Sequence, residues 1–446
     1  MKKTPGPHLL GGLKQQLIQQ AMDRKTSTLQ PAITPVDASA QKAIPEHFYR
    51  FELHPGYQQL RILNDAAAQM GISNPFFKLH EGLAGARTTI AGREYINFAS
   101  YNYLGLSGHP AVNKAAVAAI EHYGTSVSAS RPVSGDRPLH RELEAEIAKA
   151  YDAEDAIVFV SGHATNVSTI GYLFGTRDLI IHDELIHNSV VQGIQLAGSK
   201  RLSFPHNNWE ALDAILSAQR DHFERVLIVV EGIYSMDGDF PDLPKFIDIK
   251  HRHHCFLMVD EAHSFGVLGA TGLGIKEHFN IASKDVDIWM GTLSKALASC
   301  GGYIAGNVAL IEHLKFLAPG FLYSVGMSPP LAAAALSALH IVQSEQHRVE
   351  TLRTRGQAFL MQAKDAGINT GTSSGNAIIP AIIGSSLKAI QISEKLMECG
   401  VHVQPILYPA VPEKSARLRF FISSDHSDAD ISYSVTTLAK ILNENA

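Results

Sequence analysis

Apolar residues recur with helical periodicity at the start of the chain, and this periodicity then ends. Leu10, Leu13, Leu17 and Ala21 recur at the spacing of one helix face, and Gln, Lys and Arg occupy the opposite face. Residues 27–45 instead carry three prolines among Thr, Ser and Ala, a composition typical of a linker. We therefore expect residues 1–45 to form an N-terminal extension of one amphipathic helix followed by a linker.

Several roles for this extension stay open. Packing on the body of the protein or on a partner subunit is the simplest interpretation, and docking to another protein is a second. A mitochondrial presequence is a third, because basic residues outnumber acids in the first 25 positions. No basic n-region, apolar core and cleavage site follow one another, so a secretory signal peptide is not expected.

Residues 46–99 form an N-terminal segment of their own. Apolar spacing over residues 57–70 predicts a helix that ends at Gly71. Residues 88–98 alternate as a β-hairpin does, with Ala91 and Gly92 at the turn.

From about residue 100 the pattern becomes that of an α/β protein. Short apolar runs alternate with helical segments, which predicts a mostly parallel sheet. The predicted strands are residues 156–160, 179–182, 226–231, 256–260 and 288–290. We assign residues 100–335 to a large domain, and in such sheets the ligand lies at the carboxyl ends of the strands.

A smaller α+β domain is expected over residues 336–446. A helical stretch at 329–366 leads into it. Apolar runs then predict strands of an antiparallel or mixed sheet at 378–383, 401–403 and 418–422, with a helix at 387–399.

Composition and charge narrow the class of protein. The chain has 446 residues, of which 45% are hydrophobic and 18% charged, values that suit a globular enzyme with a sizeable core. No apolar run approaches the roughly 18 residues of a membrane span. The formal net charge is -5 with scattered basic residues, so nucleic acid is not an expected partner. Three widely spaced cysteines without a CxxC pair favour a reducing compartment, and we expect a cytoplasmic protein.

The stretch 259–302 holds the residues with the clearest chemistry. Asp260 ends an apolar strand, His263 follows closely, and Lys295 lies in a loop of small residues. A lysine that forms a Schiff base and an acid that pairs with a pyridinium nitrogen are what pyridoxal phosphate (PLP) requires. Two simpler interpretations stay open, with Asp260 as a helix N-cap and His263 as a hydrogen-bonded core residue.

A second group of candidates follows other strand ends. Gly162 and His163 open a helix directly after the first predicted strand, where backbone amides can bind a phosphate. Thr292 offers a hydroxyl to the same group. His187 and Ser235 follow two further strands, where a ring can stack on the cofactor and a hydroxyl can bond to it.

Arginines and acids complete the candidate set. Arg419 alternates with Arg417 on one strand face, and a buried arginine that faces the cofactor can clamp an amino-acid carboxylate. The acidic residues within 237–242 are expected in a solvated loop. The histidines at 251, 253 and 254 lack a carboxylate or cysteine partner, so we expect a solvated helix end there and no metal site.

These motifs together resemble those of the α-oxoamine synthases, which are fold-type I PLP enzymes. Six motifs in this order carry the resemblance, namely Phe-Ala-Ser-Tyr-Asn-Tyr-Leu-Gly-Leu (98–106), Ser-Gly-His-Ala-Thr-Asn (161–166), Asp-Glu-Leu-Ile-His (183–187), Glu-Gly-Ile-Tyr-Ser-Met-Asp-Gly (231–238), Asp-Glu-Ala-His-Ser-Phe-Gly (260–266) and Gly-Thr-Leu-Ser-Lys (291–295). The resemblance covers the chain from about residue 70 onward. It implies a homodimer with shared active sites that condenses an amino acid with an acyl thioester and releases CO2.

The resemblance also implies a role for each matching residue. For catalysis and the cofactor ring these are Lys295 (holding the cofactor and moving the Cα proton), Asp260 (pyridine nitrogen), His263 and Ser235 (phenolate oxygen) and His187 (ring stacking). For the phosphate they are Gly162, His163, Thr292 and, from the partner subunit, Ser324. For the substrate they are Arg419, which binds the carboxylate, together with Tyr101 and Asn102.

Departures from the family pattern favour one branch. Tyr101 and Asn102 stand in a Ser-Tyr-Asn-Tyr motif like that of serine palmitoyltransferases and polyketide-associated synthases, and the tail of the lysine loop looks most like the latter. His163 replaces a common aromatic residue. We therefore expect glycine, alanine or serine as the amino acid, with CoA or an acyl carrier protein as the carrier. Alternatives are aminooxononanoate synthase or glycine C-acetyltransferase, a PLP aminotransferase or lyase, and a non-catalytic subunit of a heterodimeric synthase.

Overall fold

The structure, a computed structural model, describes residues 44–69, 71 and 74–444, and the chain divides into two units between residues 71 and 72. The first unit holds η1 (Glu46–Phe48), η2 (Phe51–Leu53) and α2 (Pro55–Gln69). α2 confirms the helix predicted over residues 57–70. The amphipathic helix expected near the N-terminus lies outside the described residues.

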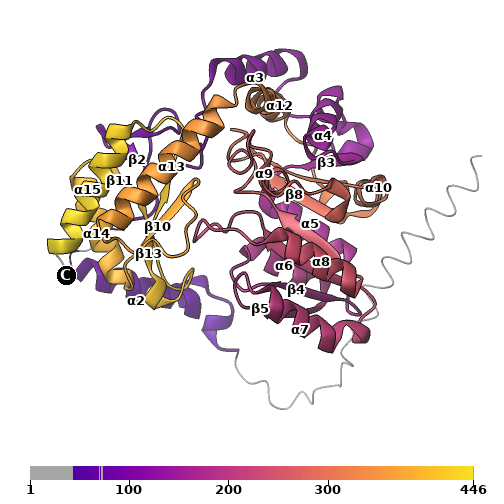
Figure 1. Ribbon diagram of the computed structural model, residues 1–446, viewed down its shortest axis with the longest axis horizontal. Helices are drawn as coiled ribbons and strands as arrows, with labels where there is room; N and C mark the ends of the chain where they lie inside the picture. Colours follow the sequence, from indigo (N-terminus) through magenta and orange to yellow (C-terminus); the bar gives the residue numbers. More distant parts are fainter. Residues whose placement is uncertain (1–43, 70, 72–73, 445–446) are drawn as a thin grey trace, which may run out of the picture. The chain divides into compact units, whose positions relative to one another are not determined.

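A seven-stranded sheet forms the centre of the second unit (Figure 1). Its strands, in spatial order, are β3 (Asp155–Phe159), β9 (Gly302–Gly306), β8 (Ile288–Thr292), β7 (Phe256–Asp260), β6 (Val226–Glu231), β4 (Leu179–Asp183) and β5 (Lys200–Phe204). β9 is antiparallel to both neighbours, and every other adjacent pair is parallel. The mostly parallel sheet and its five predicted strands are confirmed.

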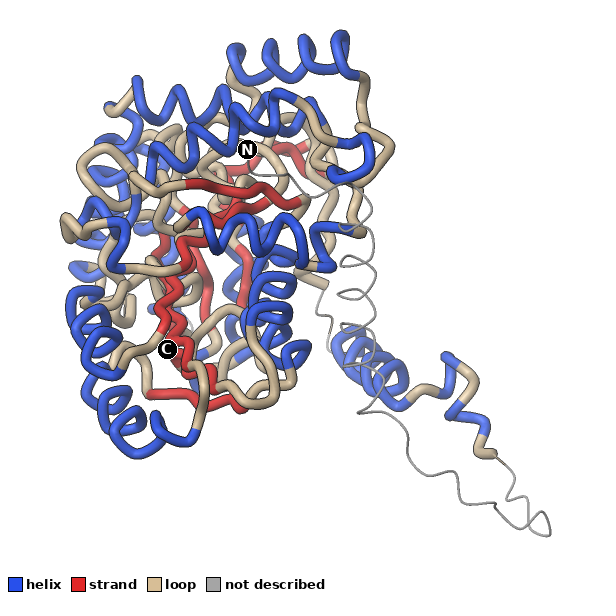
Figure 2. The backbone as a smooth tube through the Cα atoms, turned by 90° about the vertical axis from the view of Figure 1, so that its right-hand side faces the viewer, coloured by secondary structure: helices blue, strands red, loops and turns tan. Residues whose placement is uncertain are grey.

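Helices cover both faces of this sheet, as Figure 2 shows by the helices on either side of the strands. Alternate residues of one strand enter different hydrophobic clusters, such as Ile228 in one and Val229 in the other. Burial on both faces explains why these strands are continuous apolar runs in the sequence. The surrounding helices are α3 (Pro110–Tyr123), α4 (Pro138–Tyr151), α5 (Gly162–Leu173), α6 (Asn188–Ala197), α7 (Trp209–Gln219), α8 (Leu243–His253), α9 (Gly274–His278), α10 (Val308–Leu317) and α11 (Pro319–Leu322).

The helical stretch predicted at 329–366 is two helices, α12 (Pro329–Ser344) and α13 (His347–Asp365), which lead to a smaller antiparallel sheet. That sheet has the order β10 (Ile378–Ile382), β13 (Arg417–Phe421) and β12 (Gln404–Ile406). α14 (Ser386–Glu398) packs against this sheet, and α15 (Asp428–Glu444) packs against α13 and α14. Arg419, on β13 of the second sheet, lies near the carboxyl ends of the parallel strands of the central sheet.

The predicted strand at 401–403 does not join the C-terminal sheet. Its residues form β11 (Val401–His402), which pairs in parallel with β2 (Arg93–Asn97), itself paired with β1 (Arg87–Ile90). The hairpin predicted at 88–98 is therefore confirmed, and the expected partner of the later strand was wrong. Pairing between positions about 300 residues apart leaves no local signal, because both partners read as ordinary half-buried strands.

Across the described helices, none has the combination of length and apolar character that crossing a bilayer demands.

Candidate active site

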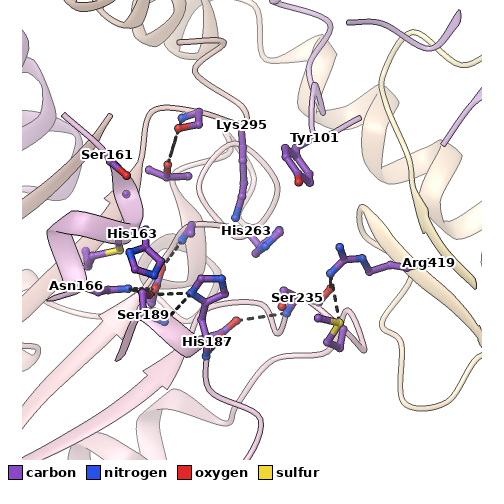
Figure 3. A pocket seen from close by; sticks show the side chains of 18 residues that line it. Tyr101, Ser161, His163, Asn166, His187, Ser189, Ser235, His263, Lys295 and Arg419 are labelled. Carbon is purple, nitrogen blue, oxygen red and sulfur yellow. Dashed lines mark hydrogen bonds between the residues drawn. The ribbon is translucent and has the colours of Figure 1, made fainter. Parts of the chain in front are cut away.

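A cavity of about 320 Å³ opens at the carboxyl ends of the parallel strands (Figure 3). Figure 3 shows Lys295 pointing into it, between His163 and His187 on one side and Arg419 on the other. The lining residues are Tyr101, Ser161, Gly162, His163, Asn166, His187, Ser189, Glu231, Ser235, Met236, Asp260, Ala262, His263, Met290, Thr292, Ser294, Lys295 and Arg419. Ten of the twelve residues proposed from the sequence are among them.

Asp260 presents a buried carboxylate at the end of β7, with an exposed fraction of 3%. Asn166 Nδ2 donates to Asp260 Oδ2 at 2.8 Å, and the amide of Ala262 donates to Oδ1 at 2.9 Å. The second bond resembles an N-cap, but residues 262–264 form a turn and no helix follows. A buried carboxylate held by neutral donors is suited to a cationic ligand nitrogen.

Lys295 reaches the cavity from the loop after β8, and its Nζ lies 6.0 Å from the centre of the Tyr101 ring. Burial lowers the pKa of Lys295 to about 8. The negative charges of Asp260 and Glu231 oppose this shift, and the positive charge of Arg419 adds a smaller lowering of the pKa. The amine is therefore far closer to its neutral, nucleophilic form at physiological pH than a surface lysine is.

His263 lies in the turn after Asp260 and is both a cavity residue and a hydrogen-bonded core residue. Its Nδ1 is 2.7 Å from the hydroxyl of Tyr103, which is fully buried. Burial lowers the pKa of His263 well below its usual value. The ring is thus neutral, and Tyr103 fixes its orientation.

Glu231, at the end of β6, holds two of the predicted residues in place. Its Oε1 accepts from the amide of His187 at 2.7 Å and its Oε2 from the amide of Ser235 at 3.3 Å. The His187 ring is fixed further by Ser189, whose Oγ is 2.8 Å from Nδ1. Burial lowers the pKa of His187, so this ring is also neutral and suited to stacking. Burial likewise raises the pKa of Glu231 well above its usual value.

The N-terminus of α5 is suited to bind an anion. Its first amides are free of intrahelical partners and point toward the cavity end of the helix. A Cβ on Gly162 would lie 2.7 Å from Thr292 Oγ1, so only glycine allows this approach. Thr292 Oγ1 is 3.1 Å from Ser294 Oγ, which places two hydroxyls at the same point.

Arg419 and Arg417 leave the same face of β13 but end in different environments. Arg417 forms an ion pair with Asp237 at 2.6 Å. Arg419 instead donates to the carbonyl of Ser235 at 3.0 Å, and its Nε is buried without a hydrogen-bond partner in the described chain. Burial lowers the pKa of Arg419 from its ordinary value. A buried guanidinium with a free donor is suited to a ligand carboxylate.

Two residues proposed from the sequence lie outside the cavity. Asn102 is buried, and its amide donates to Ala84 O at 2.8 Å and accepts from the amide of Ser107 at 3.1 Å. It braces its own loop rather than facing a substrate, because both ends of its amide are already bonded. Ser324 lines a different, open pocket with Ser128 and Ser130.

The acidic loop expected to be solvated is largely buried. Asp237 and Asp239 are 9% and 8% exposed, because each has a cationic partner that the sequence pattern does not reveal. These partners are Arg417 for Asp237 and His206 for Asp239. The expectation was therefore wrong for Asp237 and Asp239, whereas Asp242 is exposed as expected.

The cavity fits PLP on the chemistry of its own groups. It offers an amine of lowered pKa, a buried carboxylate for a cationic nitrogen and an anion site at a helix N-terminus. Asn166 Oδ1 and Arg419 Nε, both on the cavity wall, have no hydrogen-bond partner within the described residues. A bound ligand with complementary polar groups would satisfy them.

Comparison with known proteins agrees with this geometry. The family model described as aminotransferase class I and II matches residues 93–438. The 8-amino-7-oxononanoate synthase of Geobacter sulfurreducens is 39% identical, over 81% of this chain and 92% of its own. A Sphingomonas wittichii serine palmitoyltransferase superposes with a TM-score of 0.84 at 26% identity, over 88% of this chain and 98% of that one. A serine palmitoyltransferase structure with PLP as the internal aldimine gives a TM-score of 0.83 at 26% identity, over 87% and 98%.

The chain therefore belongs to the aminotransferase class I and II family and has the fold-type I PLP-transferase architecture. Within that family it is an α-oxoamine synthase, a PLP-dependent acyltransferase. The expected family, fold class, enzyme class and cofactor are confirmed.

Among the residues that support the site, Asn166, Glu231 and Tyr103 were not proposed from the sequence. Glu231 ends an apolar strand just as Asp260 does, and that position was a usable signal. Asn166 and Tyr103 act through partners 94 and 160 residues away, so nothing near them in the sequence marks their role.

We expect the rate at which PLP-free protein takes up PLP to rise with pH and to level off above about 8. The neutral amine is the form that attacks an aldehyde, and the pKa of Lys295 is lowered to about 8. Recovery of PLP absorbance followed between pH 6.5 and 10 measures this. A midpoint near the ordinary lysine value of 10.5 would contradict the environment described for Lys295.

Proposed function

We propose that this enzyme condenses a small amino acid with an acyl thioester and releases CO2 and a thiol, leaving an α-amino ketone. Arg419 carries the proposal, because it is a buried guanidinium with a free donor in the same cavity as Lys295. No acidic side chain of the described residues forms an ion pair with it. An amino-acid carboxylate is the ligand that such a group would hold.

PLP, when bound, supplies the electron sink for the charge left at Cα when a bond there breaks. Lys295 Nζ is the group that takes the Cα proton and later returns a proton to Cα. Asp260 keeps a proton on the pyridine nitrogen, and Asn166 fixes that carboxylate. His187, held by Glu231 and Ser189, orients the ring. Arg419 holds the carboxylate until it leaves as CO2.

The proposed amino acid is glycine, alanine or serine. Tyr101 lines the cavity with its ring centre 6.0 Å from Lys295 Nζ, and we propose that this ring limits the side chain at Cα to a small one. The acyl group arrives on CoA or on an acyl carrier protein. Tyr101 is 45% exposed and stands at the open side of the cavity, where a thioester would enter.

The test is a matrix of glycine, alanine and serine against acyl-CoA and acyl carrier protein thioesters. We expect CO2 and free thiol in equal amounts, formed only when both substrates are present, and a product mass equal to the α-amino ketone. A keto acid product would instead indicate an aminotransferase. Thiol release without an amino acid would indicate simple thioester hydrolysis, and either result would overturn the proposal.

We further propose a homodimer whose subunits share each active site. Ser324 lies on an open pocket of about 460 Å³ outside the cavity of its own chain. Its neighbours Tyr323 and Val325 are 80% and 49% exposed, and apolar side chains exposed in this way are what a second subunit would cover.

Ser324→Ala is therefore expected to weaken PLP binding by about tenfold, the loss of one hydrogen bond to a charged phosphate, while the molar mass stays that of a dimer. PLP titration and light scattering measure the two quantities. A monomeric wild-type protein with full activity would contradict the shared site.

We also propose a cytoplasmic location, because Cys255, Cys300 and Cys399 are all free thiols. Cell fractionation tests it.

A further inference from the structure

A charged cluster outside the cavity has no task in the mechanism above. His206 follows β5 and lies between two carboxylates, with Nδ1 2.9 Å from Asp183 Oδ1 and Nε2 3.0 Å from Asp239 Oδ2. Asp183 is 0% and Asp239 8% exposed. None of these three residues lines the cavity.

His206 is a cation at neutral pH. Both of its ring nitrogens face carboxylate oxygens, and both can donate only when the ring is protonated. Burial alone would lower the pKa of His206, but the hydrogen bonds to Asp183 and Asp239 and the charges of both acids raise it to about 10. Without this cation, two buried carboxylates would face each other with no charge between them.

Asp183 anchors the cluster to the central sheet. It is the last residue of β4, and its two oxygens also accept from the amides of Leu185 at 2.9 Å and Asn207 at 2.7 Å. With three donors on one carboxylate, Asp183 has little freedom to move, and it holds His206 against a rigid element.

Asp239 belongs to a tight turn that ends beside the cavity. The amide of Tyr234 donates to Asp239 O at 2.9 Å, and the amide of Gly238 donates to Tyr234 O at 2.8 Å. Asp239 Oδ2 also accepts from Thr372 Oγ1 at 2.7 Å. The turn is closed on itself, so fixing Asp239 fixes the residues between 234 and 239.

Those residues are the ones that Arg419 contacts. Arg419 Nη1 donates to Ser235 O at 3.0 Å and lies 3.4 Å from Met236 Sδ. Arg417 donates to Met236 O at 3.0 Å, so both arginines of β13 are attached to the same turn. A continuous path of contacts therefore joins His206 to Arg419.

We propose that His206 is a positioning residue that sets the affinity for the amino acid, by fixing through Asp239 the turn against which Arg419 is held. The inference rests on the proposed carboxylate role of Arg419. It predicts a specific loss in the variant His206→Asn, where the amide keeps at most one of the two bonds and the charge is gone.

The experiment measures the Kd of glycine, L-alanine and L-serine on the PLP-loaded dimer by the change in PLP absorbance. We expect H206N to raise the Kd of the amino acid that is turned over by about tenfold, with PLP content and the KM of the acyl thioester unchanged. Adding D239N to H206N should recover part of the loss, because it removes one of the two facing carboxylates. A purely structural defect would lower PLP content and both substrate affinities together.

The double variant H206N/R419Q separates this inference from the proposed function. If His206 acts through Arg419, H206N should add little to the effect of R419Q. A further tenfold rise in that background, or an unchanged Kd in H206N alone, would overturn the inference while leaving the function intact. If R419Q alone leaves the Kd unchanged, the carboxylate role fails and the inference fails with it.

A matched control is H253N, since His253 Nε2 also pairs with an aspartate, Asp213 Oδ1 at 2.6 Å, on helices outside the cavity. Its amino-acid Kd should equal that of the wild type. Should H206N not fold, D239N makes the same test, because it weakens the bond on the loop side with no change of size. We then expect a rise of a few-fold, and no rise would overturn the inference.

Discussion

Lys295→Ala is expected to lower kcat by a factor on the order of 10³ to 10⁶. The variant loses the amine of lowered pKa that lies 6.0 Å from the centre of the Tyr101 ring, and no other lysine lines the cavity among the described residues. The residue proposed to move the Cα proton and to hold the cofactor covalently is then absent. Steady-state turnover and PLP retained after dialysis measure the two losses.

Lys284→Ala is the matched control, because Lys284 is an exposed lysine in η5 (Ser283–Asp285), ahead of the same strand. It should leave both quantities unchanged. Turnover by Lys295→Ala within a factor of ten of the wild type would show that another group moves the proton.

Arg419→Gln is expected to raise the KM for the amino acid by about a hundredfold, with a much smaller change in the KM for the acyl thioester. Truncating one partner of a buried charge pair costs roughly 2–5 kcal/mol, and about 2.7 kcal/mol corresponds to a hundredfold. The glutamine keeps a polar group near Ser235 O but loses the charge and the free Nε donor.

Arg419→Lys sharpens this test, since it keeps the charge and loses the planar fork. We expect it to lie between the wild type and the glutamine variant. Equal KM values for the amino acid in all three proteins would rule out Arg419 as the carboxylate-binding residue.

The strands at the centre of the fold could be predicted because burial on both faces makes each of them a continuous apolar run in the sequence. β6 (Val226–Glu231) and β7 (Phe256–Asp260) were placed at their observed ends. β5 was missed because it is an edge strand with exposed Lys200, Arg201 and Ser203. β9 was missed because glycines begin and end it, and glycine is uncommon in strands.

The cavity could be predicted in outline for a related reason. Asp260 ends a strand and His187 and Ser235 follow strands, and the carboxyl ends of parallel strands meet on one side of the sheet. The supporting contacts could not be foreseen, because Asn166, Tyr103 and His206 meet their partners only in the folded chain. The burial of Asp237 and Asp239 follows from the same kind of distant pairing.

The residues that line the cavity are unevenly distributed along the sequence. The lining residues from Ser161 to Lys295 belong to strands of the central sheet and to the turns and helices that follow them, whereas Arg419 comes from β13 of the second sheet. The residues proposed to hold PLP and the residue proposed to hold the carboxylate therefore lie on separate stretches of sequence. On that proposal, a substitution near Arg419 can change amino-acid affinity without touching the residues proposed to hold PLP.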